Sequence, residues 1–187
     1  MTLPPPDAAE EPKPWTFAWE ASAMVHAGRT DRLDVLLHLA DSLAPVTRHV
    51  TTAAVSQELQ KCDLLVPEAM DVEHVDGLAE IKSLVTWAHL LSSSLHDRGE
   101  ATICAWAEVH RATAIIDDGA ARRAAAREGL DVHGTAWVIA QAVNAGAEKP
   151  RGACALLQTL IADGARYPFH TGDEFLDWAK TVGLARW

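Results

Sequence analysis

The sequence lacks several features that would point directly to a class of function. Its apolar runs are short and are interrupted by His, Asp or Arg, so no segment is predicted to span a membrane. The glycine-rich patterns GxGxxG and GxxxxGKS/T are both absent, which removes the usual signs of a nucleotide-binding loop. The nine histidines are scattered and the three cysteines are widely spaced, so neither residue type shows the spacing of a zinc site.

Positive charge is also scarce. Lys and Arg total 16 against 26 Asp and Glu, which gives a net charge of −10. Proteins that grip nucleic acid through its phosphates usually present a basic face, because phosphate contacts supply most of the affinity. The charge therefore disfavours a strong, generic nucleic-acid binder, while a local arginine cluster or an acidic metal site remains compatible with it.

The N-terminal residues 1–14 show no signal-peptide pattern. Their five prolines and several acids predict a disordered or polyproline-like lead-in outside the folded part. Cys62, Cys104 and Cys154 are odd in number and lie among apolar neighbours, which favours buried, reduced thiols in a cytoplasmic protein. The overall composition, 49% apolar and 22% charged, is that of an ordinary globular protein.

Short strand patterns alternate with helical patterns along the rest of the chain. Strands are predicted at residues 16–19 and 45–50, within 63–72 and 112–118, and at 130–133. An amphipathic helix is predicted where Leu78, Ile81, Leu84, Val85 and Ala88 recur at helical intervals. The alternation predicts one α/β domain over residues 15–187, with a mostly parallel central sheet and extra helices at its C-terminal end.

Acidic side chains recur at comparable positions in this predicted topology. They follow the first strand, lie on the helix after the second, open the helix before the strand 112–118, and follow that strand: Glu20, Glu58, Glu100, Asp117 and Asp118. Ligands of open α/β sheets gather outside the carboxyl ends of the strands. Carboxylates that converge there repel one another unless a cation lies between them, and Mg²⁺ or Mn²⁺ suits oxygen ligands. Such a metal supports the hydrolysis of phosphodiesters by nucleases.

Each of these acids also has a purely structural explanation. Asp97 and Glu100 lie where the helix dipole favours negative charge. Asp117 and Asp118 precede a helix, where Asp is a common N-cap, and Glu58 fits a solvated helix face. One by one the acids favour the structural explanation, whereas the set as a whole is equally consistent with a site.

A few other residues admit two interpretations. Arg122 and Arg123 either meet a phosphate near the metal or balance the adjacent acids, and Ser22 either orients the metal or caps a helix. The tryptophans on predicted helices are expected in the core or in an interface rather than as base-stacking platforms: Trp87, Trp106 and Trp137. Trp178 and Trp187 are candidates for docking the C-terminal tail or a partner.

The order of several short motifs resembles that of the PIN-domain family, in particular its small bacterial and archaeal members. The matching stretches are "EASAMVHAG", "RLDVLL", "AAVSQEL", "RGEATICAWA", "AIIDDGAARRAAAREGLDVHGT" and "AWVIAQAVNAG", within residues 15–183. The resemblance implies a three-layer α/β fold and, in active members, cleavage of single-stranded RNA at an acidic Mg²⁺ or Mn²⁺ site. Many such proteins are toxins held inactive by a small antitoxin protein, and many form homodimers.

By position, the resemblance places Glu20 at the family's first acid, Glu58 at the second, Glu100 at the third, and Asp117 or Asp118 at the last. The family's first acid is nearly always Asp, and the longer Glu side chain displaces the carboxylate, which octahedral Mg²⁺ tolerates poorly. Two hypotheses follow: a metal-dependent endoribonuclease, and a catalytically degenerate module that acts in protein–protein interaction or assembly.

Overall fold

The computed structural model describes residues 15–91 and 98–187. The predicted lead-in 1–14 and the predicted helix-opening Asp97 lie outside the described residues. Within the described part of the chain, five strands form one sheet in the order β3-β2-β1-β4-β5, and every neighbouring pair is parallel. The strands are β1 (Trp15–Trp19), β2 (Thr47–Thr52), β3 (Met70–Glu73), β4 (Thr113–Ile115) and β5 (Val132–His133).

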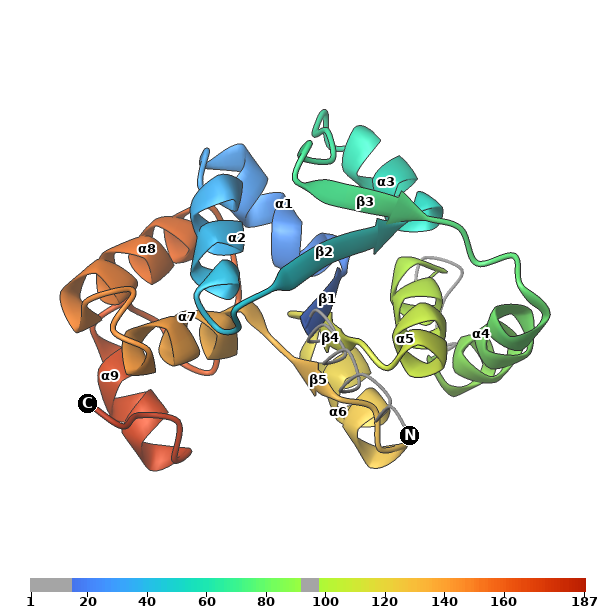
Figure 1. Cartoon of the computed structure of the whole chain (residues 1–187). Helices are drawn as coiled ribbons and strands as arrows, with labels where there is room; N and C mark the ends of the chain where they lie inside the picture. Colours follow the sequence, from blue (N-terminus) through green and yellow to red (C-terminus); the bar gives the residue numbers. More distant parts are fainter. Residues whose placement is uncertain (1–14, 92–97) are drawn as a thin grey trace, which may run out of the picture.

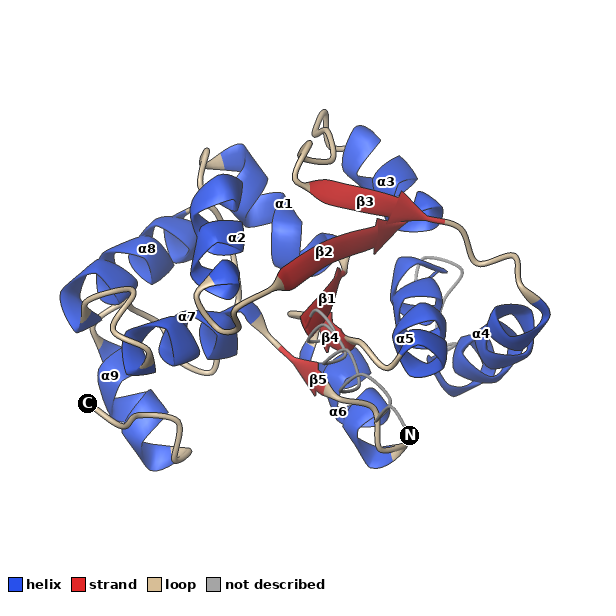
Figure 2. Ribbon diagram, in the orientation of Figure 1, coloured by secondary structure: helices blue, strands red, loops and turns tan. Residues whose placement is uncertain are grey.

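Helices cover both faces of the sheet, so the fold is the three-layer α/β sandwich that the sequence predicts. In Figure 1, α1, α2, α7, α8 and α9 lie on one side of the strands and α4, α5 and α6 on the other. Figure 2 shows the strands as the middle layer between the two groups. The bounds are α1 (Ala21–Arg29), α2 (Leu33–Asp41), α3 (Ala53–Gln60), α4 (Leu78–Leu91), α5 (Arg98–His110), α6 (Gly119–Arg127), α7 (Thr135–Asn144), α8 (Pro150–Ala162) and α9 (Glu174–Thr181).

The strand predicted within residues 63–72 forms only at its end. Asp63 adopts a positive φ of 57°, and the amide of Met70 donates a hydrogen bond to the carbonyl of Pro67 at 3.0 Å. This turn keeps the preceding segment out of the sheet, so Leu65 is exposed and pairing begins at Met70. The strand predicted at 45–50 is likewise shifted and runs from Thr47 to Thr52.

The core is built around β1 and α5. Phe17, Ala18 and Trp19 are fully buried, as expected for a central parallel strand covered on both faces. Helix α5 is buried at every residue from Ala101 to Ala107, so it fills the layer between the sheet and α4. Trp87 and Trp106 lie in this core, as predicted. No helix in the described ranges is both long enough and apolar enough to cross a bilayer.

The thiols only partly match their prediction. Cys104 and Cys154 are buried and unpaired, whereas Cys62 is also unpaired but partly exposed at the end of α3. Burial is the main reason that the pKa of the Cys104 thiol lies well above its usual value, with nearby Glu100 and Glu20 adding to the effect. Cys104 is therefore a packed, unreactive thiol.

The apolar stripe of the predicted amphipathic helix does not face the core. Leu78 is 72% exposed and Val85 is 67% exposed on α4, while Trp87 on the opposite side is 2% exposed. The buried side of α4 also holds Glu80 and Ser83, and both have hydrogen-bond partners on α5. His110 bonds Glu80, and Glu108 accepts hydrogen bonds from Ser83 and Trp87. The side of α4 that faces the core is therefore the one with hydrogen-bonded polar groups and Trp87, and not the apolar stripe that hydrophobicity alone would turn inward.

The strand order reverses direction between β1 and β4. The chain steps from β1 to β2 and β3 on one side and then returns to place β4 on the other side of β1. The connections that leave β1 and β4 therefore diverge, and ligands of such sheets bind outside the carboxyl ends at this point, a region called the crevice below. Glu20 directly follows β1, and Ile116, Asp117 and Asp118 follow β4.

The orientation of α4 has a direct consequence for stability. We expect Trp87→Ala to lower the free energy of unfolding by about 3–5 kcal/mol, because it empties a large core volume and removes a buried hydrogen bond. Val85→Ser, on the exposed stripe two residues earlier, is expected to change it by less than about 0.5 kcal/mol. Urea denaturation of both variants measures this, and a larger loss for Val85→Ser would contradict the orientation.

Candidate functional site

Glu20 joins β1 to α1 and is buried, with 4% of its surface exposed. It serves as the N-cap of α1: its Oε2 accepts hydrogen bonds from the amide of Ser22 at 2.7 Å and from the Ser22 hydroxyl. Burial raises the pKa of its carboxyl to about 7; the Ser22 bonds oppose this rise and the neighbouring charge of Glu58 adds to it. Burial and the charge of Glu58 therefore make the ionised form of the Glu20 carboxyl unfavourable.

Ser22 connects the two strands that border the crevice. Its Oγ accepts hydrogen bonds from the amides of Asp117 at 3.0 Å and Asp118 at 3.2 Å, while the same hydroxyl donates to Glu20. The expectation that Ser22 caps the following helix is wrong, because Glu20 is the cap. Ser22 instead positions Glu20 relative to the backbone that follows β4.

Glu58, on α3, reaches the start of α5. Its Oε1 accepts a hydrogen bond from the amide of Gly99 at 3.1 Å. A Cβ at position 99 would lie 2.4 Å from the Glu58 carboxylate, so only glycine allows this approach without displacing the side chain. The contact brings Glu58 to the residue next to Glu100, and its charge also acts on Glu20.

Glu100 lies in the first turn of α5 and is partly buried. Its charge and that of Glu20 both raise the pKa of the Cys104 thiol, one turn along the same helix. The charge of Glu58 acts on Glu20, and Glu58 bonds the amide next to Glu100, so the three predicted glutamates lie on connected elements, the end of β1, α3 and the start of α5.

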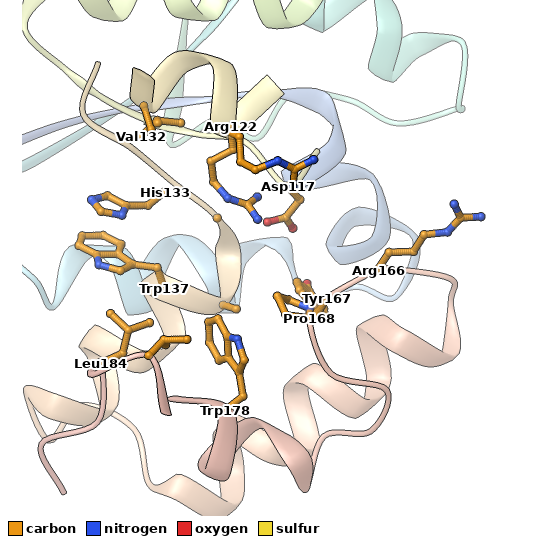
Figure 3. A pocket seen from close by; sticks show the side chains of 15 residues that line it. Asp117, Arg122, Val132, His133, Trp137, Arg166, Tyr167, Pro168, Trp178 and Leu184 are labelled. Atoms are coloured by element: carbon orange, nitrogen blue, oxygen red, sulfur yellow. The ribbon is translucent and has the colours of Figure 1, made fainter. Parts of the chain in front are cut away.

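Asp117 follows β4 and is held by the start of α7. Its Oδ1 accepts from the amide of Thr135 at 2.8 Å, and its Oδ2 accepts from the Thr135 hydroxyl at 2.6 Å. The Thr135 hydroxyl also bonds the hydroxyl of Tyr167 at 2.9 Å. Burial raises the pKa of Asp117, while Thr135 and the charge of Arg122 counteract the rise. Figure 3 shows Asp117 between Arg122 and Tyr167.

Asp118 is turned away from this group. It is exposed and is the N-cap of α6, since its Oδ1 accepts from the amides of Ala120 and Ala121, both at 2.8 Å. Its geometry matches the structural explanation given for it above. Arg122 donates to the carbonyl of Ile116 at 2.7 Å and balances the charge of Asp117, which is one of its two predicted roles.

The carboxylates fit a hard divalent cation in their chemistry but are not assembled around one point. Among residues 15–91 and 98–187, no three His, Cys, Asp or Glu side chains lie close enough together to hold a metal ion as they stand. Yet Glu20 is buried beside the charge of Glu58, a combination that a cation would relieve. Coordination therefore requires side chains such as Glu58 to leave the partners they have here.

Several residues of this region have no role in the sequence prediction. Thr135 fixes Asp117, and Tyr167 joins it from a segment 50 residues beyond Asp117 in the chain. Gly134 allows the contact: a Cβ there would lie 2.7 Å from Asp117 Oδ1 and 3.1 Å from Arg122 Nη1. Gly99 and the pair Gly134-Thr135 do fall within the motifs quoted for the family resemblance, whereas no local pattern marks Tyr167.

A parallel α/β sheet with acidic residues at its switch point defines the class of the protein by its fold, a three-layer α/β sandwich. A family model described as a PIN domain matches residues 19–181. The chain therefore belongs to the PIN-domain family, as its motifs predict. The family is of nuclease type, binds nucleic acid and generally depends on a divalent metal. No curated protein and no solved structure matches the chain.

The raised pKa of Glu20 gives a pH-dependent stability. Between pH 4.5 and about 7 the unfolded chain loses this proton while the folded protein keeps it. Because the unfolded state binds fewer protons in this window, the stability contribution of Glu20 falls as the pH rises and levels off above pH 7. We therefore expect Glu20→Gln to be neutral near pH 5 and stabilising by up to about 3 kcal/mol at pH 8.

Urea denaturation with EDTA at both pH values measures this difference. Glu128→Gln, at an exposed position on the C-cap of α6, is the control for loss of a negative charge. Equal effects of Glu20→Gln at pH 5 and pH 8 would show that Glu20 ionises normally.

Proposed function

We propose that the protein is a metal-dependent endoribonuclease that cleaves single-stranded RNA. The observation that carries the proposal is the burial of Glu20 directly after β1, with its pKa raised beside the charge of Glu58, which itself bonds the amide next to Glu100. Membership of the PIN-domain family supports a nuclease in general. The reaction is hydrolysis: water adds to the phosphorus and the bond to one ribose oxygen breaks.

In this proposal Glu20, Glu58 and Glu100 hold one Mg²⁺ or Mn²⁺ ion, and Asp117 borders the same crevice. The cation, when bound, supplies an activated water and neutralises charge on the phosphodiester. Ser22 keeps Glu20 in place relative to Asp117 through its hydroxyl, and Thr135 holds the Asp117 carboxylate. Asp118 is assigned to capping α6 rather than to the ion.

Family resemblance extends the proposal to partners. Many related proteins are toxins that a small antitoxin protein holds inactive, and we propose such a partner and a homodimer for this chain as well. Co-expression with the adjacent reading frame, followed by light scattering of the purified complex, tests both. Growth arrest on expression of the chain alone, relieved by that partner, is the outcome that supports a toxin.

The metal site makes a quantitative prediction. Wild-type protein is expected to bind Mn²⁺ in calorimetry and to cleave single-stranded RNA only with Mn²⁺ or Mg²⁺ present. Glu20→Gln and Glu100→Gln each remove a proposed ligand, so cleavage should fall by at least about a hundredfold. Glu68→Gln, at an exposed position far from β1 in sequence, is the matched control and should cleave normally. Metal-independent cleavage, or full activity of Glu20→Gln, would contradict the proposal.

A second candidate is a catalytically degenerate PIN module that acts in protein interaction or assembly. It is favoured by the engagement of the site carboxylates: Glu20 is bonded by Ser22 and Asp117 accepts two bonds from Thr135. In this candidate the longer side chain of Glu20 is the cause of the lost activity, because the family usually has Asp at that position.

Glu20→Asp separates the two candidates. If the wild type neither binds Mn²⁺ nor cleaves RNA, and Glu20→Asp gains micromolar Mn²⁺ binding, the chain is a degenerate copy that one methylene inactivated. If the wild type is active, Glu20→Asp is expected to change its metal preference or rate rather than create activity. Calorimetry on folded protein, checked by circular dichroism, provides the readout.

A further inference from the structure

A pocket of about 420 Å³ lies beside Asp117, outside the carboxyl ends of β4 and β5. Its walls come from α6, from β5 and α7, and from the C-terminal segment that contains Tyr167 and Trp178 (Figure 3). Its volume falls within the range of about 300–1,000 Å³ typical of small-molecule sites. The carboxylate chemistry proposed above leaves this pocket without a role.

Aromatic side chains form much of its wall. His133 and Trp137 stack with their ring centroids 3.8 Å apart and their planes at 6°. Trp178 and Tyr167 lie across the pocket from this pair in Figure 3, and both are partly buried. Most of the lining surface is aromatic and aliphatic, so a planar ring that enters the pocket meets surface that suits stacking of a nucleobase.

Two arginines of α6 bring positive charge to one wall of the same pocket, and the guanidinium of Arg166 points away from it in Figure 3. Arg122, Arg123 and Arg166 line it, although the chain as a whole carries a net charge of −10. Among the described residues that line it, Asp117 is the acid, and its two oxygens already accept hydrogen bonds from Thr135. Arg122 is fixed by the carbonyl of Ile116, whereas Arg123 is exposed at the pocket mouth. The charge of this lining favours an anion.

We propose that this pocket binds one nucleotide of single-stranded RNA, with the base between the aromatic side chains and a phosphate at Arg122 and Arg123. The aromatic side chains suit a planar ring and the arginines suit a phosphate, so the lining as a whole suits a ligand that carries both. The inference rests on the proposed function in one respect: because Asp117 borders both sites, the bound nucleotide belongs to the substrate strand and flanks the scissile phosphate. The nucleotide-binding step itself needs neither metal nor cleavage.

The first test measures binding of the four ribonucleoside 5′-monophosphates by calorimetry, with EDTA present to exclude cleavage. Ala126 is exposed on α6 and lines the pocket, so Ala126→Trp fills it without removing a core contact. We expect this variant to weaken binding by roughly fivefold to a hundredfold, the range of one stacked base. Ala120→Trp, at an exposed position of the same helix outside the pocket, should bind as the wild type does.

The second test addresses the arginines with a non-cleavable 2′-O-methyl RNA hexamer. Arg123→Gln should weaken binding and make the slope of log affinity against log salt less negative by about 0.7, the value of one phosphate contact to a single strand. Arg127→Gln removes the same charge one turn further along α6, outside the pocket, and should leave the slope unchanged. A deoxyribose hexamer distinguishes RNA from DNA as the source of the nucleotide.

The outcomes separate this inference from the proposed function. Absence of binding of all four mononucleotides at millimolar concentration, or binding that Ala126→Trp does not weaken, overturns the pocket assignment even if the protein cleaves RNA. Loss of binding in Ala126→Trp and Arg123→Gln, with no cleavage under any metal condition, supports the pocket and overturns the nuclease proposal. If both hold, Ala126→Trp should raise KM for RNA more than it lowers kcat.

Discussion

The burial of the Glu20 carboxylate is the constraint on which the carboxyl edge of this sheet depends. The side chain directly follows the three buried residues at the end of β1 and is withdrawn from water beside a second carboxylate, so its ionised form is costly. The structure limits that cost with the backbone and hydroxyl of Ser22, and the same hydroxyl then bonds the backbone that follows β4. One polar junction thereby sets the positions of the two strand ends that border the crevice.

The fold could be predicted largely because its signals are local. The alternation of strand and helix patterns predicts the parallel α/β sandwich, and the family motifs are confirmed by the family match. The orientation of α4 could not be predicted by periodicity, since the inward positions of Glu80 and Ser83 depend on His110 and Glu108 in another helix. Strand β3 begins at Met70, later than the apolar pattern predicts, for a similar reason. The turn that precedes it is held by a backbone hydrogen bond from Met70 to Pro67, which hydrophobicity does not reveal.

The geometry of the candidate site could be predicted from the sequence only in part. The family motifs predict Glu20, Glu58 and Glu100 as one site; in the structure the charge of Glu58 acts on Glu20, and Glu58 bonds the amide next to Glu100. The sequence does not distinguish the roles of Asp117 and Asp118, because the two adjacent side chains differ only in where they point. Asp117 points to Thr135, and Asp118 caps α6. The aromatic pocket depends on Tyr167 and Trp178, which the tertiary fold brings back over α7, and no pattern near Asp117 announces them.

The hydrogen bond between Glu58 and Gly99 joins α3 to the first turn of α5. An oxygen of α3 serves as the acceptor for the first-turn amide of α5, and glycine is required for the approach. Under the proposed function, a Glu58 that turns toward a cation leaves that amide without its acceptor, so the amide proton exchanges with solvent more readily. The hydrogen-exchange rate of the Gly99 amide therefore reports whether the Glu58 carboxylate is bonded to it.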